Sequence, residues 1–127
     1  MYYTVKDYED EFGNDDLPLG DDDNIDSSKV ERAIDRACRE ANTYIRSSGM
    51  STPLSAEDNA EALGEIKGYV LDMARYYVFD NSTSEESQKR YDSAIKFFDK
   101  VASGKTNLFK QESLSAVGTL FSMRVVI

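Results

Sequence analysis

The sequence predicts an all-α fold, a compact bundle of one short and three longer helices with an extended or short β-prone C-terminal tail. Apolar residues recur at steps of three and four along most of the chain, and capping residues and glycines bracket these stretches. With 127 residues, 40% of them hydrophobic, the chain suffices for one buried core. We therefore expect a helical domain over residues 1–106 and a tail over residues 107–127, which is a candidate intersubunit arm.

The first predicted helix is Val5–Phe12. Thr4 and Asp7 form a capping box in which aspartate replaces the usual Glu or Gln, and Gly13 is a natural end. Val5, Tyr8 and Phe12 share one face. A loop then follows over residues 14–27, because proline, glycine and a run of aspartates favour turns there.

The second predicted helix begins after Ser28, which forms a Ser-x-x-Glu capping box with Glu31, and ends before Gly49. Its residues at helical spacing predict one apolar face. This face comprises Val30, Ala33, Ile34, Ala37, Cys38, Ala41, Tyr44 and Ile45.

The third predicted helix begins after a cap at Ser55 and runs to about Phe79. Its broad apolar stripe indicates a central helix, and Gly64 and Gly68 within it indicate a close helix crossing. The stripe comprises Leu63, Ile66, Val70, Met73 and Tyr77.

The fourth predicted helix begins after Ser84 and ends at Gly104. The tail beyond it lacks helical periodicity and ends in apolar, β-prone residues. So much apolar surface at a chain end requires a partner, either the chain's own core or a neighbouring subunit. The candidate intersubunit residues are Leu114, Leu120, Phe121, Val125, Val126 and Ile127.

The acidity of the chain is local. The net charge is −9, and residues 1–26 alone carry ten acids and one base. Such a segment is not expected to bind nucleic acid, because that binding requires clustered Lys and Arg. It could instead bind a basic protein surface or line a channel that DNA must cross. A solvated loop that aids solubility is the alternative. The candidate partner-facing residues are Asp15, Asp16, Asp21, Asp22, Asp23 and Asp26.

No catalytic constellation stands out. The chain has no histidine, which excludes histidine-based acid–base, nucleophilic and metal chemistry. Cys38 is the single cysteine and is expected to be a buried apolar residue. We expect no cofactor and no enzymatic activity, and no apolar run is long enough for a membrane span.

Two acidic patterns are weak metal candidates. Asp22, Asn24 and Asp26 alternate like calcium ligands, but Ser27 and Ala33 replace the glycine and glutamate that an EF-hand requires. A solvated helix face explains the acids of the third helix better than a magnesium site does. These acids are Glu57, Glu61, Glu65 and Asp72.

The order of the elements resembles the Mu-like phage and prophage family of head-to-tail joining proteins, of the connector type. The resemblance covers residues 2–106. It rests on a Tyr-x-Thr-Val-x-Asp-Tyr start, a Phe-Gly helix end, an acidic loop, and the segments Val30–Ala37, Ala41–Ile45, Leu71–Phe79, Arg90–Phe98 and Val101–Lys105.

The resemblance implies a non-enzymatic adaptor that forms an oligomeric ring between the portal and the tail. Its partners would be the portal and tail proteins and further copies of itself. Packaged DNA would pass through without sequence-specific binding, and no membrane would be involved. The resemblance implies a place in the virion. We expect assembly in the host cytoplasm, because residues 1–4 lack a secretion signal.

Two other functions remain open. A small acidic helical module, such as a prophage-encoded inhibitor, would bind a basic host protein in a salt-sensitive way. A magnesium-dependent nucleotide hydrolase would bind metal at the acids of the third helix.

Overall fold

A computed structural model describes residues 1–13, 26–79 and 84–106, and these residues form a helical bundle without strands. The helices are α1 (Val5–Phe12), α2 (Ser27–Ser47), α3 (Ala60–Val78) and α4 (Glu85–Ser103). The all-α prediction is confirmed. The predicted acidic loop, apart from its last two residues, and the predicted tail lie outside the described residues.

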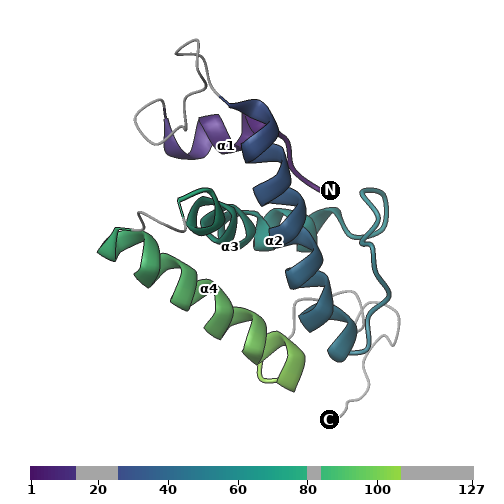
Figure 1. Cartoon of the computed structure of the whole chain (residues 1–127). Helices are drawn as coiled ribbons and strands as arrows, with labels where there is room; N and C mark the ends of the chain where they lie inside the picture. The colour runs from purple at the N-terminus through teal and green to yellow at the C-terminus, as the bar shows by residue number, and fades with distance from the viewer. Residues whose placement is uncertain (14–25, 80–83, 107–127) are drawn as a thin grey trace, which may run out of the picture.

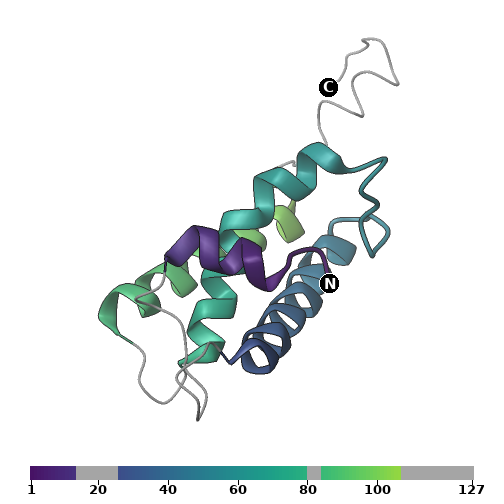
Figure 2. The same ribbon diagram turned by 90° about the horizontal axis from the view of Figure 1, so that it is seen from above.

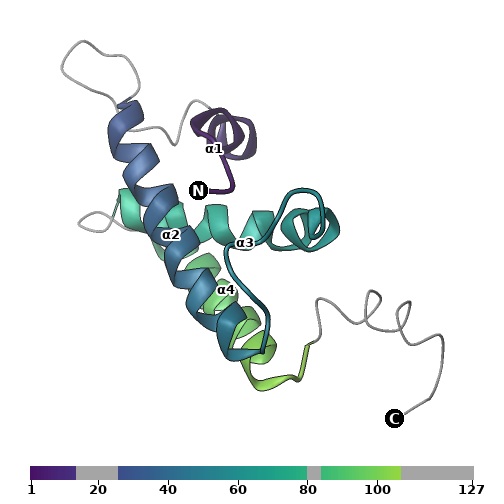
Figure 3. The same cartoon turned by 90° about the vertical axis from the view of Figure 1, so that its right-hand side faces the viewer.

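Helix α3 is the centre of the bundle, because it contacts all three other helices. It passes between α2 and α4, while α1 lies on the opposite side of α3 from α4 (Figures 1 and 3). Seen from above, α1 lies across the bundle over α3 (Figure 2). The predicted central position of the third helix is confirmed.

The core draws on all four helices. Tyr8 is the contribution of α1, and α2 and α3 supply most of the rest. Cys38 is buried, as predicted, and burial raises the pKa of its thiol. The largest fully buried side chains are Tyr8, Val30, Ile34, Ile45, Ile66, Val70, Leu71, Met73, Val78, Phe98 and Val101.

Two predicted helix starts are confirmed. The Thr4 hydroxyl accepts the Asp7 backbone N–H at 3.1 Å, and the Asp7 carboxylate accepts the Thr4 N–H at 2.8 Å, so the capping box is complete. The Ser84 hydroxyl accepts the Ser87 N–H at 3.1 Å. Gly104 ends α4 in the left-handed conformation, with φ 81°, which glycine adopts without strain.

The other two predicted starts are wrong. The cap of α2 is Asp26, whose carboxylate accepts the Lys29 N–H at 3.1 Å, so the helix begins before Ser28. The hydroxyl of Ser55 caps a separate turn, because it accepts the N–H groups of Glu57 and Asp58. Helix α3 therefore begins only at Ala60.

The close helix crossing predicted at Gly64 and Gly68 is also wrong. Both glycines are exposed, and a Cβ atom added at either would meet no described atom within 4 Å. Among the described residues, neighbouring helices therefore do not require glycine at these positions.

Candidate functional site

The structure describes one of the predicted partner-facing acids, Asp26, and places it at the N-terminus of α2. Its carboxylate caps the helix, so at least part of its role is structural. Asp15, Asp16 and the aspartates at 21–23 lie outside the described residues, as do the six candidate residues of the tail.

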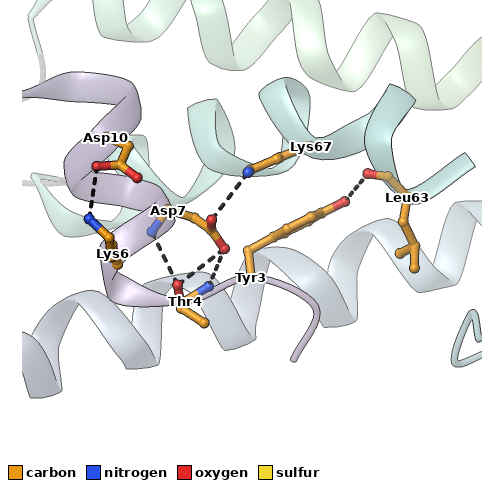
Figure 4. Close-up of polar contacts among 7 residues, drawn as sticks. All are labelled: Tyr3, Thr4, Lys6, Asp7, Asp10, Leu63 and Lys67. Carbon is orange, nitrogen blue, oxygen red and sulfur yellow. Dashed lines mark hydrogen bonds and ion pairs between the residues drawn. The ribbon is translucent and has the colours of Figure 1, made fainter. Parts of the chain in front are cut away.

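The N-terminal segment is fixed to α2 and α3 by polar contacts that we call the N-terminal dock. Figure 4 shows the contacts with α3. The Tyr3 hydroxyl donates to the Leu63 carbonyl at 2.5 Å, and the Lys67 ammonium lies 3.1 Å from the Asp7 carboxylate. The Tyr2 hydroxyl donates to Asn42 Oδ1 at 2.6 Å. The segment thus reaches both α2 and α3.

Charge in the dock is compensated. The backbone hydrogen bond from Thr4 and the contact with Lys67 hold the pKa of Asp7 below its usual value. Burial raises the pKa of the Tyr3 phenol, so its proton stays available for the Leu63 carbonyl. The dock is therefore a structural connection with its partners in place.

A second polar cluster lies on α3, between the end of α1 and the first turn of α4. The guanidinium of Arg75, a largely buried side chain, lies 5.2 Å from the centre of the Phe12 ring and 3.4 Å from the Glu86 carboxylate. Asp72 pairs with Arg90 at 3.5 Å. Burial raises the pKa of Asp72, against the opposing effect of Arg90.

A groove of about 370 Å³ lies between α2 and α4, and we call it the α2–α4 groove. Tyr44, Tyr91 and Ile95 supply its less polar surface, and they are partly buried. Glu40 comes from α2, and Asp92 and Lys96 come from α4. The groove therefore combines aromatic rings with charges of both signs, the acids in excess.

The aromatic walls of the groove are held by packing from behind. Tyr91 stacks on Tyr76 with ring centres 4.1 Å apart, and Tyr44 stacks on Phe98 at 6.0 Å. Offset-stacked rings at such distances stabilise each other beyond the area they bury. Tyr44 and Tyr91 are therefore positioned by other rings of the bundle.

Glu40 is the half-buried carboxylate of the groove. It accepts a hydrogen bond from the Tyr77 hydroxyl, and the guanidinium of Arg36 lies over the Tyr77 ring, 3.9 Å from its centre. Burial raises the pKa of Glu40, and Arg36 opposes this only in part. Within the described parts of the chain, Glu40 has no ion pair.

Comparison with known proteins identifies the family. The model of the family described as "Bacteriophage Mu, Gp36" matches residues 2–124. The chain belongs to this family. No curated protein and no solved structure matches the chain. The match extends past residue 106, where the resemblance found from the sequence motifs ended, and it includes most of the tail of this Gp36-family chain.

The solvent face of α2 carries a basic stripe that the sequence analysis did not single out. Arg39 pairs with Asp35 at 3.1 Å, and Arg46 donates to the Thr52 hydroxyl at 2.8 Å. Steps of three, four, three and seven residues between the bases place them on one side of the helix, and this spacing is the signal that predicts the stripe. The stripe comprises Lys29, Arg32, Arg36, Arg39 and Arg46, all exposed.

The groove was missed for a different reason. The sequence analysis assigned Tyr44 to the apolar face of the second predicted helix and did not single out Tyr91 or Glu40, whereas the structure places all three at a groove between α2 and α4. The arginines beside the tyrosines in sequence do not join them: Arg75 contacts Phe12 and Glu86, and Arg90 contacts Asp72. Helical periodicity predicts on which face of its helix a residue lies, but it does not predict how much space is left between two packed helices.

The acids of the third predicted helix are dispersed. Glu57 lies in the turn that precedes α3, and Asp72 is paired with Arg90. Over residues 1–13, 26–79 and 84–106, no group of three or more acidic or cysteine side chains is placed to hold a metal ion. No described helix is both long and apolar enough to cross a membrane.

Proposed function

We propose that this chain is a structural adaptor of a tailed phage or prophage that joins the portal to the tail as part of an oligomeric ring and performs no catalysis. The observation that carries the proposal is the match of the Mu Gp36 family model to residues 2–124. The match includes both the acidic segment and most of the tail. These segments therefore belong to the same family sequence as the helical domain.

The bundle supports this role physically. Helix α3 contacts the three other helices, and all four contribute fully buried side chains, so the domain is a single packed body. A subunit of a ring must keep its fold while it packs against the neighbouring subunits. The net charge of −9 within residues 1–26, against none over the other residues, offers a surface for a basic partner.

The test is association with itself and with the portal protein encoded by the same phage genome. Light scattering on a sizing column over a concentration series, followed by negative-stain imaging, measures the mass and shape of the species. We expect rings of the chain alone or rings formed when the portal is added. A monomer that persists in the presence of the portal would contradict the proposal.

Two variants test which segments carry the association. Replacing Asp21, Asp22 and Asp23 with asparagine removes three acids from the acidic segment and should weaken binding to the portal. The matched control removes the same charge from Glu57, Asp58 and Glu61, which are exposed before and at the start of α3, and should leave binding unchanged. Deleting residues 107–127 should abolish ring closure, and unchanged assembly would exclude the tail as an intersubunit arm.

The concentrated acidity also favours a second candidate, a small acidic module that binds a basic host protein, as a prophage-encoded inhibitor would. Such binding depends steeply on salt, because exposed charges are screened over about 8 Å at physiological ionic strength. Affinity capture from host extract at low and at high salt separates the two functions. A monomer that captures a basic host protein only at low salt would favour this candidate over the adaptor.

A further inference from the structure

The α2–α4 groove presents carboxylates from two helices on its two sides. Glu40 is half-buried and bound to the Tyr77 hydroxyl, and Asp92 accepts a hydrogen bond from Gln88 at 3.1 Å. Lys96 also lines the groove, but within the described residues it is ion-paired with neither acid. Arg36 compensates the Glu40 charge only in part, and a partly buried carboxylate without a direct ion pair favours a further cation.

The space between these carboxylates is suited to a long side chain. Its volume is about 370 Å³, and Tyr44, Tyr91 and Ile95 line it. Alkyl carbons can pack against these three residues, and a cation near a tyrosine ring is attracted by the electrons of the ring. A planar guanidinium satisfies both demands, because it stacks on aromatic rings and donates two parallel hydrogen bonds to a carboxylate.

We propose that the α2–α4 groove binds an arginine side chain of a protein partner, with the guanidinium between Glu40 and Asp92 and its alkyl part against Tyr91 and Ile95. The proposal rests on the proposed adaptor function only in taking that partner to be a protein of the phage particle. Two acids on opposite walls select for positive charge, and the aromatic surface selects for a flat cation over a compact one.

The test is a titration of the isotope-labelled full chain followed by NMR. The probe is N-acetyl-arginine methylamide, and the control probe is N-acetyl-norleucine methylamide, which has an alkyl side chain without charge. We expect saturable shifts in the signals of Glu40, Tyr44, Tyr91 and Ile95 with the arginine probe only. Glu40→Gln should weaken binding about tenfold, the factor that a charge-assisted hydrogen bond of roughly 1.4 kcal/mol provides.

The matched control is Glu31→Gln. Glu31 lies on the same helix nine residues before Glu40, which is two and a half turns, so it is exposed on the opposite face. Glu31→Gln should leave binding unchanged and should have the same effect on net charge. Asp92→Asn, on an exposed position of α4, provides a second test should Glu40→Gln disturb the fold.

Three results would overturn the proposal. They are the absence of saturable binding of the arginine probe, equal binding of the uncharged probe, and equal weakening by Glu31→Gln and Glu40→Gln. None of them depends on ring formation. A chain that binds the probe but never assembles with the portal would contradict the adaptor function and leave the groove as an arginine site. A chain that assembles with the portal but does not bind the probe would contradict the arginine site and leave the adaptor function standing.

Discussion

The N-terminal dock and the α2–α4 groove each centre on a carboxylate, Asp7 in the dock and Glu40 in the groove. The Asp7 carboxylate accepts hydrogen bonds from the backbone N–H and the hydroxyl of Thr4 and is paired with the Lys67 ammonium, and its pKa is lowered. Glu40 has a phenol as partner and no ion pair among the described residues, and its pKa is raised by burial. The difference separates a charge that stabilises the fold from one that the fold leaves open to a ligand.

The largest effect should come from the core residue of α1, the helix that follows the dock. Tyr8 is fully buried, and Tyr8→Ala should lower the free energy of unfolding by about 3–5 kcal/mol, the cost of removing a buried aromatic side chain. Urea denaturation followed by circular dichroism measures it. A loss below about 1 kcal/mol would show that α1 adds little to the stability of the other three helices.

The next effect separates the two carboxylates. Asp7→Ala removes the acceptor of the Thr4 N–H and the partner of Lys67, and should cost about 0.5–2 kcal/mol, as the loss of a helix cap does. The control is Asp10→Ala on the same helix, whose exposed pair with Lys6 at 3.5 Å should contribute less than about 0.5 kcal/mol. Equal losses in the two variants would remove the distinction between the dock and an ordinary surface pair.

A gain of stability is expected from a substitution at Gly68, on the exposed side of α3. Gly68→Ala should raise the free energy of unfolding by roughly 0.5–1 kcal/mol, because alanine favours the helix and its Cβ meets no described atom within 4 Å. Thermal denaturation measures the change. A loss of stability instead would reveal a contact at this face.

Replacing the groove carboxylate Glu40 should change the free energy of unfolding very little. Glu40→Gln keeps an acceptor for the Tyr77 hydroxyl and removes the charge that burial penalises, so stability at pH 7 should rise or stay within about 0.5 kcal/mol. A loss comparable to that of Asp7→Ala would show that Glu40 is a structural charge. The arginine-binding proposal would then lose its electrostatic basis.

The dependence on pH should have opposite signs in the two regions. The lowered pKa of Asp7 adds stability that is complete above about pH 3.9 and is lost as the pH falls through its folded value. The raised pKa of Glu40 means that stability declines as the pH rises from about 4.3 through its folded value. In a plot of the urea midpoint against pH, Asp7→Asn should therefore flatten the rise at acid pH. Glu40→Gln should remove part of the decline that follows at higher pH.

Local signals explain how much of this molecule the sequence predicts. The Thr4–Asp7 box, the Ser84 cap and Gly104 act within a turn of the chain, and all three are confirmed. The predicted starts of α2 and α3 are wrong because several nearby polar residues are each able to cap a helix or a turn. At α2, Asp26 caps the helix before Ser28 can, and Ser55 satisfies a turn of its own.

The candidate site was predicted less well, because it depends on distances between helices. Nothing in the spacing of Glu40 and Tyr91 indicates that α2 and α4 diverge enough to leave a groove, whereas the basic stripe follows from spacing within α2 alone. Of the partner-facing acids and apolar tail residues that sequence reasoning selected, the structure describes only Asp26.

Arg75 has a consequence for how the molecule opens. It is the mostly buried cation that contacts the Phe12 ring at the end of α1 and the Glu86 carboxylate in the first turn of α4. Helices α1 and α4 do not contact each other, so this side chain provides a link between them through α3. Backbone amides in these two distant segments should therefore exchange hydrogen as one cooperative unit.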